Sequence, residues 1–140
     1  MSFMLKEARE TAAIVANQDV NAALALAESL KSQPPRGVVT VARGTSDHAL
    51  GYLGYWLMHT RGMPVASLPP SLSSVLQTPW QVPGYLALAA SQSGSPPDVI
   101  AMLQALQAGG AKTVALVNVV PSPLANACQH LLPVQAGEEK

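Results

Sequence analysis

Five short apolar runs, each followed by turn residues, alternate with segments of helical character along most of this chain of 140 residues. The runs span residues 37–42, 64–68, 85–91, 113–119 and 130–136, and the patterns between them predict helices over residues 46–61, 96–109 and 122–128. Strands that alternate with crossover helices pair in parallel and are buried on both faces. The sequence therefore predicts an α/β fold, a doubly wound three-layer sandwich around a five-stranded parallel sheet.

The segment before the first predicted strand has the apolar spacing of a helix over residues 4–31, from Leu5 to Leu30. Asn17, Asp19 and Asn21 are weak helix formers and good caps, so one long helix and two helices joined there both stay open. We divide the chain into a helical lead-in, residues 1–36, and a domain of residues 37–140.

Two further local expectations concern the middle of the chain. The predicted helix 46–61 has an apolar face, to which we assign Leu50, Leu53, Trp56 and Leu57. Four prolines make residues 69–83 largely irregular, with one turn of helix over residues 71–77.

The composition excludes several classes of function. Charged residues make up only 11% of the chain, their net charge is zero, and no basic cluster occurs, so nucleic acid is not an expected partner. No apolar run approaches the ~18 residues of a membrane span. Apolar residues reach 49%, which predicts that another subunit or domain covers part of the surface.

The cysteine content and the N-terminus indicate the compartment. The only cysteine, Cys128, excludes an internal disulfide, fits a reducing cytoplasm and is interpreted as a small buried residue. The first ten residues, MSFMLKEARE, carry charges where a signal peptide needs an apolar core. We therefore expect a cytoplasmic protein.

Polar loops follow three of the predicted strands. RGTSDH (43–48) follows the first and SQSGS (91–95) the third, while Asn118 and Ser122 follow the fourth. The carboxyl ends of parallel strands lie at one edge, where such sheets bind their ligands. Hydroxyls and backbone N–H groups at helix N-termini favour anions, and the neutral donors suit a phosphorylated polyol such as a sugar phosphate. The alternative is that these hydroxyls simply cap helices.

Other common motifs are missing. There is no GxGxxG after the first strand, no GxxxxGK[ST] and no GxSxG, which argues against a dinucleotide site, a P-loop and a nucleophile elbow. The three histidines are far apart, and no metal cluster is expected. His59 is interpreted as a partner of a helix dipole and His130 as structural, while His48 is either a ligand contact or a surface residue.

The sequence RGTSDHA and the sequence SQSGSPPD resemble the two signatures of the SIS (sugar isomerase) domain family. ALVNVVPSPLANACQHLLPVQAGEE is similar to the family's stretch from the fourth strand to the end of the fifth, so the resemblance covers residues 5–140. It implies a flavodoxin-like sheet order and phosphosugar binding, without a cofactor or a metal. Within the family, the chain is most similar to the isomerase half of glucosamine-6-phosphate synthase and to related amino-sugar-phosphate deaminases and isomerases.

The resemblance also implies site residues. Thr45 and Ser46 match positions that contact the sugar, with Ser46 near the phosphate, and Ser91, Gln92 and Ser93 match the phosphate loop. Gly94 matches a glycine that lets the backbone turn close to the ligand. Pro96 stands where the family's synthase has a threonine, so either Ser95 supplies the missing donor or the phosphate is held less well. Gly44, His48 and Glu139 are further candidate contacts.

Members of this branch carry two SIS domains in tandem and work as dimers, which implies that this chain is the first of two domains. The family's proton-transferring glutamate, its ring-opening histidine and its C-terminal lysine come from the second domain and the tail. We therefore expect no catalytic residue in these 140 residues. The full-length parent is expected to be an isomerase or deaminase of hexosamine 6-phosphate or fructose 6-phosphate.

Two alternatives remain open at this stage. The chain is a non-enzymatic phosphosugar-sensing module of a regulator, an idea motivated by the missing catalytic half. Otherwise it is a structural lobe whose site has decayed, an idea motivated by Pro96.

Overall fold

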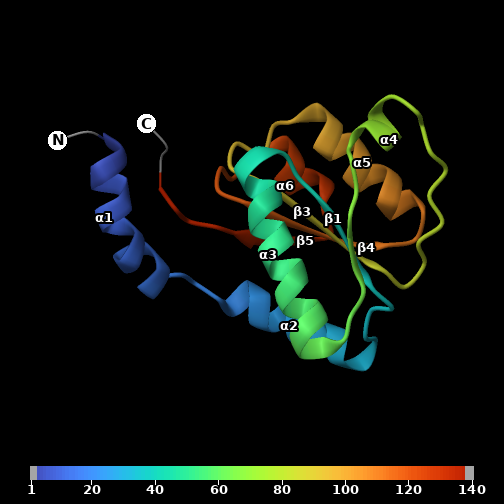
Figure 1. Ribbon diagram of the computed structural model, residues 1–140, viewed down its shortest axis with the longest axis horizontal. Helices are drawn as coiled ribbons and strands as arrows, with labels where there is room; N and C mark the ends of the chain where they lie inside the picture. Colours follow the sequence, from blue (N-terminus) through green and yellow to red (C-terminus); the bar gives the residue numbers. More distant parts are fainter. Residues whose placement is uncertain (1–2, 138–140) are drawn as a thin grey trace.

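The computed structural model describes residues 3–137, which form a five-stranded parallel sheet between two layers of helices (Figure 1). The strands are β1 (Val38–Val41), β2 (Val65–Ser67), β3 (Leu86–Ser91), β4 (Lys112–Val117) and β5 (His130–Pro133). Their order is β2-β1-β3-β4-β5, and each neighbouring pair is parallel. This confirms the predicted fold class and places β1 beside β3.

Six helices occur in residues 3–137: α1 (Phe3–Ala16), α2 (Asn21–Ser32), α3 (Gly44–Arg61), α4 (Ser71–Ser74), α5 (Pro97–Ala108) and α6 (Pro123–Ala127). The lead-in consists of two helices rather than one. The joint lies where the capping residues predicted it, because the Asp19 carboxylate accepts the Asn21 N–H at 2.9 Å.

The core has two halves, one on each face of the sheet. Val39 and Val41 of β1 point to the side covered by α5 and α6, whereas Val38 points to the side covered by α2 and α3. This alternation follows from the two-residue period of a strand. Because both faces are covered, all four residues of β1 are buried.

One expectation about an apolar face is wrong. Trp56 is 49% exposed and does not join Leu50, Leu53 and Leu57, which contact the core. The reason is geometric, since successive helical residues are about 100° apart and Trp56 falls beyond the stripe that reaches the sheet. No residue of α1 is buried, and in Figure 1 this helix projects away from the sandwich toward the C-terminal segment.

The segment after the last strand is held by the joint between α1 and α2. The Gln18 amide donates to the carbonyl of Val134, and the Asp19 N–H donates to the Gln135 side chain at 3.2 Å. The predicted strand 130–136 ends early, at Pro133, and the Val134 N–H just beyond it still donates to the Val117 carbonyl at 2.9 Å. None of the helices in residues 3–137 has both the length and the apolar character that crossing a bilayer requires.

Candidate functional site

The two predicted loops meet at the carboxyl edge of the sheet. β1 pairs with β3 from Val38 opposite Leu86 to Val41 opposite Ala89, so the loops that follow these strands begin side by side. Arg43, just after β1, and Asp98, in the first turn of α5, form an ion pair across them, with Nε 3.5 Å from Oδ2. The predicted juxtaposition of the loops is therefore present in the structure.

The first loop turns directly into α3. Arg43 is the N-cap residue, with an extended backbone, and no side chain caps this helix. Gly44, at φ +56°, opens the first turn, in which Thr45 is exposed and Ser46 half-buried. In residues 3–137 the hydroxyls of Thr45 and Ser46 have no hydrogen-bond partner. The alternative that these hydroxyls are caps is therefore wrong for this loop.

The second loop folds back on itself through its serines. The Ser91 hydroxyl accepts the Gly94 N–H at 3.1 Å, and the Ser93 hydroxyl accepts the Ser95 N–H at 3.3 Å. The Ser95 hydroxyl donates to the Ser93 carbonyl at 3.2 Å. These bonds gather three hydroxyls within five residues at the start of α5.

Helix α5 also begins without a side-chain cap. Its N-cap residue is Pro96, which has no hydroxyl, and Pro97 follows at the first helical position. By contrast, Ser122 caps the short α6 by accepting the Ala125 N–H. The N-termini of α3 and α5 thus keep N–H donors that no side chain caps, while the carboxylates of Asp47 in α3 and Asp98 in α5 offset part of the helix dipole at each first turn.

Gly94 is required by packing within the protein. It is buried at φ +65°, and a Cβ built on it would lie 2.6 Å from Ser122 Cβ and 2.8 Å from Val117 Cγ1. Its carbonyl accepts the Leu124 N–H at 2.9 Å. The second loop therefore packs on the β4–α6 connection. This packing requires a glycine at position 94, in addition to any close approach of the backbone to a ligand.

Asp98 is a further residue of the candidate site that the sequence patterns above do not single out. Its Oδ1 is buried without a hydrogen-bond partner, while Oδ2 pairs with Arg43. The pairing partly neutralises the only arginine of these loops, so hydroxyls and backbone N–H groups supply most of the anion donors. A carboxylate in the first turn of a helix interacts favourably with the helix dipole. The place of Asp98 in the first turn of the predicted helix 96–109 is therefore the sequence feature that points to it.

We expect the Arg43–Asp98 pair to contribute modestly to stability. The Arg43 side chain is 66% exposed, and exposed pairs contribute about 0.2–1 kcal/mol. A double-mutant cycle with Arg43→Ala and Asp98→Ala, followed by urea unfolding, should give a coupling energy in that range. A coupling energy near zero would contradict the role of this pair in joining the loops.

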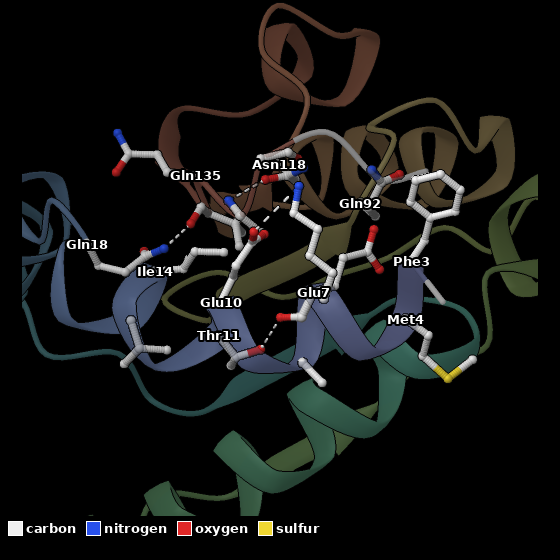
Figure 2. Close-up of a pocket in the computed structure, with 16 residues that line it drawn as sticks. Phe3, Met4, Glu7, Glu10, Thr11, Ile14, Gln18, Gln92, Asn118 and Gln135 are labelled. Carbon is white, nitrogen blue, oxygen red and sulfur yellow. Dashed lines mark hydrogen bonds and ion pairs between the residues drawn. The ribbon is translucent and has the colours of Figure 1, made fainter. Parts of the chain in front are cut away.

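A cavity of about 960 Å³ lies beside the second loop, between α1 and the segment after β5 (Figure 2). Of the predicted site residues only Gln92 lines it, and Figure 2 shows Gln92 at the end nearest Phe3. Asn118 lines it as well and holds the tail, since it accepts the Ala136 N–H and donates to the Gly137 carbonyl, both at 2.6 Å. The cavity therefore adjoins the predicted site without containing it.

The remaining candidates are dispersed. His48 is exposed one turn into α3, His59 is exposed in its last turn, and Glu139 lies outside the described residues. Cys128 is only half-buried, and burial raises the pKa of its thiol. Within residues 3–137, His, Cys, Asp and Glu side chains form no cluster able to hold a metal ion.

Residues 29–140 match the model of the SIS domain family. Two similar curated proteins are the isomerizing glutamine–fructose-6-phosphate aminotransferases of Zymomonas mobilis and Aquifex aeolicus. Each is 33% identical over 98% of this chain, but the match spans only 24% and 23% of their own lengths. The chain thus spans about a quarter of the length of these relatives.

Solved structures agree with this result. A protein of Silicibacter pomeroyi, assigned as a phosphosugar isomerase, superposes on 99% of this chain with a TM-score of 0.94 and 39% identity. The match covers 43% of that protein. The C-terminal domain of the glucosamine–fructose-6-phosphate aminotransferase from Francisella tularensis has the same fold, with a TM-score of 0.81 at 23% identity over 40% of its chain.

Proposed function

The chain belongs to the SIS domain family, and from this premise we propose that it is a phosphosugar-binding domain whose site lies between the β1–α3 and β3–α5 loops. The domain proper comprises residues 37–140, and residues 1–36 are its helical lead-in. The proposed ligand class is a hexosamine 6-phosphate or fructose 6-phosphate, and the names of the two curated relatives contain the second of these.

One observation carries this proposal: two helices with uncapped N-termini start side by side at the edge of the sheet where ligands bind. Both helices are longer than three turns, so each presents a developed dipole and its orphan N–H groups. The hydroxyls at these N-termini either have no hydrogen-bond partner or bond only within the loop. A phosphate can therefore be bound without breaking a contact to the core.

In this proposal the second loop binds the phosphate of the ligand and the first loop binds its sugar. Ser91, Ser93 and Ser95 surround the phosphate together with the first N–H groups of α5, and Thr45 and Ser46 orient the sugar. The Ser95 hydroxyl bonds to a carbonyl of its own loop, so it can turn to the phosphate at the cost of one weak hydrogen bond. Ser95 thus compensates for Pro96, which offers neither a hydroxyl nor an N–H.

The parent protein is proposed to be an isomerase or deaminase that moves a proton through an enediol-type intermediate. For this chain we propose only the binding step, because the residues of its two loops offer no free carboxylate base. Asp98 is paired with Arg43, and Asp47 accepts the Ser67 hydroxyl at 3.2 Å. We also propose that a second domain packs against this one. The proposed location is the cytoplasm, because the single Cys128 suits a reducing compartment.

Calorimetric titration tests the proposal directly. Glucosamine 6-phosphate or fructose 6-phosphate should bind, and unphosphorylated glucosamine should bind far more weakly, because the phosphate provides most of the contacts. No binding of either phosphosugar at millimolar concentration would refute the proposal, as would equal affinity for glucosamine with and without its phosphate.

The variant Ser93→Ala sharpens the test. Loss of one hydrogen bond to a charged group should weaken phosphosugar binding by ~1–2 kcal/mol, which corresponds to about 5- to 30-fold in Kd. Ser32→Ala at the exposed end of α2 is the matched control and should leave Kd unchanged. An unchanged Kd for Ser93→Ala would remove this hydroxyl from the site.

A further inference from the structure

Helix α5 begins with fewer backbone donors than an ordinary helix. The first four N–H groups of an α-helix have no partner inside the helix and are available to an anion. In α5, two of these positions are Pro96 and Pro97, which have no N–H. The Ile100 N–H already donates to the Pro96 carbonyl at 3.2 Å, so among residues 96–100 only Asp98 and Val99 offer a free N–H.

Helix α5 also carries a negative charge in its first turn. The Asp98 side chain is only 24% exposed, and its Oδ1 is buried without a hydrogen-bond partner. Water and salt screen a partly buried charge much less than an exposed one. A phosphate monoester itself carries nearly two negative charges near pH 7. Asp98 alone would therefore repel the phosphate from the helix N-terminus at which we place it.

Arg43 supplies the positive charge that this helix N-terminus lacks. It follows β1, and its Nε lies 3.5 Å from Asp98 Oδ2, so its guanidinium reaches from the first loop to the first turn of α5. Within residues 3–137 no hydrogen bond involves this guanidinium, which has five N–H groups. The Arg43 side chain is mostly exposed, so a ligand between the two loops has access to these donors.

The shape of the guanidinium suits a bridge between two anions. The group is planar, and its N–H groups form a rigid fork that matches the oxygens of a carboxylate or a phosphate. Nε faces Asp98, which leaves the edge formed by the two Nη groups for two oxygens of a phosphate. The ammonium of a lysine is a point charge and has no second edge of this kind.

We propose that Arg43 binds the phosphate of the ligand and at the same time neutralises Asp98, so that it determines the specificity of the site for a dianion. Asp98 is then a positioning residue, because it holds the guanidinium at the first turn of α5. This inference rests on the proposed function, since it adds a cation to the hydroxyls and N–H groups assigned to the phosphate. It also explains how an anion site tolerates two prolines at the start of α5.

Calorimetric titration of residues 1–140 with glucosamine 6-phosphate tests the role of Arg43. Arg43→Gln should bind about 10- to 100-fold more weakly, because hydrogen bonds to a charged group are lost and Asp98 is no longer neutralised. Arg43→Lys keeps the charge without the planar fork, so its affinity should lie between the two. Arg36→Gln is the matched control. Arg36 is exposed just before β1, at the opposite edge of the sheet, so the same loss of charge should leave Kd unchanged.

A double variant separates the charge of Arg43 from a merely structural role. In Arg43→Gln combined with Asp98→Asn, the carboxylate that repels the phosphate is removed as well. This variant should bind glucosamine 6-phosphate at least about 5-fold more tightly than Arg43→Gln alone. If Arg43 only held the two loops together, the second substitution would not restore binding. The same Kd for the single and the double variant would refute the neutralisation of Asp98.

The charge of the ligand gives an independent measurement. Glucosamine 6-sulfate has nearly the shape of glucosamine 6-phosphate but carries only one negative charge on its ester group. At pH 8 the unchanged chain should prefer the phosphate to the sulfate by about 10-fold or more, and Arg43→Gln should lose most of this preference. Circular dichroism should confirm that each variant is folded.

The outcomes distinguish this inference from the proposed function. If the unchanged chain binds neither glucosamine 6-phosphate nor fructose 6-phosphate, both are refuted. If it binds, and Arg43→Gln has the same Kd and the same preference for phosphate over sulfate, only the role of Arg43 is refuted. The hydroxyls and N–H groups of the two loops would then be sufficient for the phosphate.

Discussion

Replacing Gly94 with alanine is expected to lower the free energy of unfolding by about 2–5 kcal/mol. Positive φ costs a residue with a Cβ about 1–2 kcal/mol, and forcing a methyl group into a filled space costs about 1–3 kcal/mol more. Both conditions hold here, since φ is +65° and the new Cβ would overlap Ser122 and Val117. Urea unfolding followed by circular dichroism measures the loss.

The matched control for this variant is Gly62→Ala. Gly62 ends α3 at φ +60°, almost the same conformation, but a Cβ there would meet no atom within 4 Å. It should cost only about 1–2 kcal/mol, the part that comes from the backbone. If the two variants lost the same stability, the contact of Gly94 with Ser122 would have no energetic role, and the seating of the loop on the β4–α6 connection would be disproved.

The variant Ser93→Asp is expected to abolish phosphosugar binding, with a loss of affinity of at least about 100-fold. At about 4 Å and an effective dielectric constant of 20, two unit charges of the same sign repel by about 4 kcal/mol. The new carboxylate would also accept the Ser95 N–H that the Ser93 hydroxyl now accepts. It would thus occupy the place proposed for the anion. Calorimetry with glucosamine 6-phosphate measures the effect.

Stability should respond in the opposite direction. A carboxylate just before the N-terminus of α5 interacts favourably with the helix dipole, so Ser93→Asp should unfold at equal or slightly higher urea concentration. An asparagine side chain has nearly the shape of an aspartate but no charge. Ser93→Asn should therefore retain much more of the affinity for the phosphosugar than Ser93→Asp does. Equal loss of binding in the two variants would show that size rather than charge matters there, and would contradict an anion site in this loop.

The sheet was predictable because its evidence is local. Each strand is a short run of Val, Leu and Ala, and the parallel order follows from the helices between the runs. The pairing of β1 with β3, and with it the meeting of the RGTS and SQSGS loops, followed from the common order of such sheets. The boundaries were less predictable, as the early end of β5 at Pro133 illustrates.

The missed features depend on contacts between distant segments. The packing of Gly94 on Ser122 joins residues 28 positions apart, and no local pattern encodes it. The pairing of Arg43 with Asp98 also depends on the assembled sheet. Trp56 is large and apolar, which favours a place on the buried face, but it lies one residue outside the buried stripe, and the edge of that stripe depends on how α3 packs against the sheet.

Helix α1 has a consequence for how the molecule unfolds. None of its residues is buried, and a helix of 14 residues is only marginally stable in water on its own. The core between α2, α3, α5 and the sheet therefore does not depend on it. We expect α1 to fray in a local equilibrium of its own, so that its amide protons exchange with solvent well before those of β1 and β3. The cavity bounded by α1 would then open and close with this local equilibrium, without loss of the sheet.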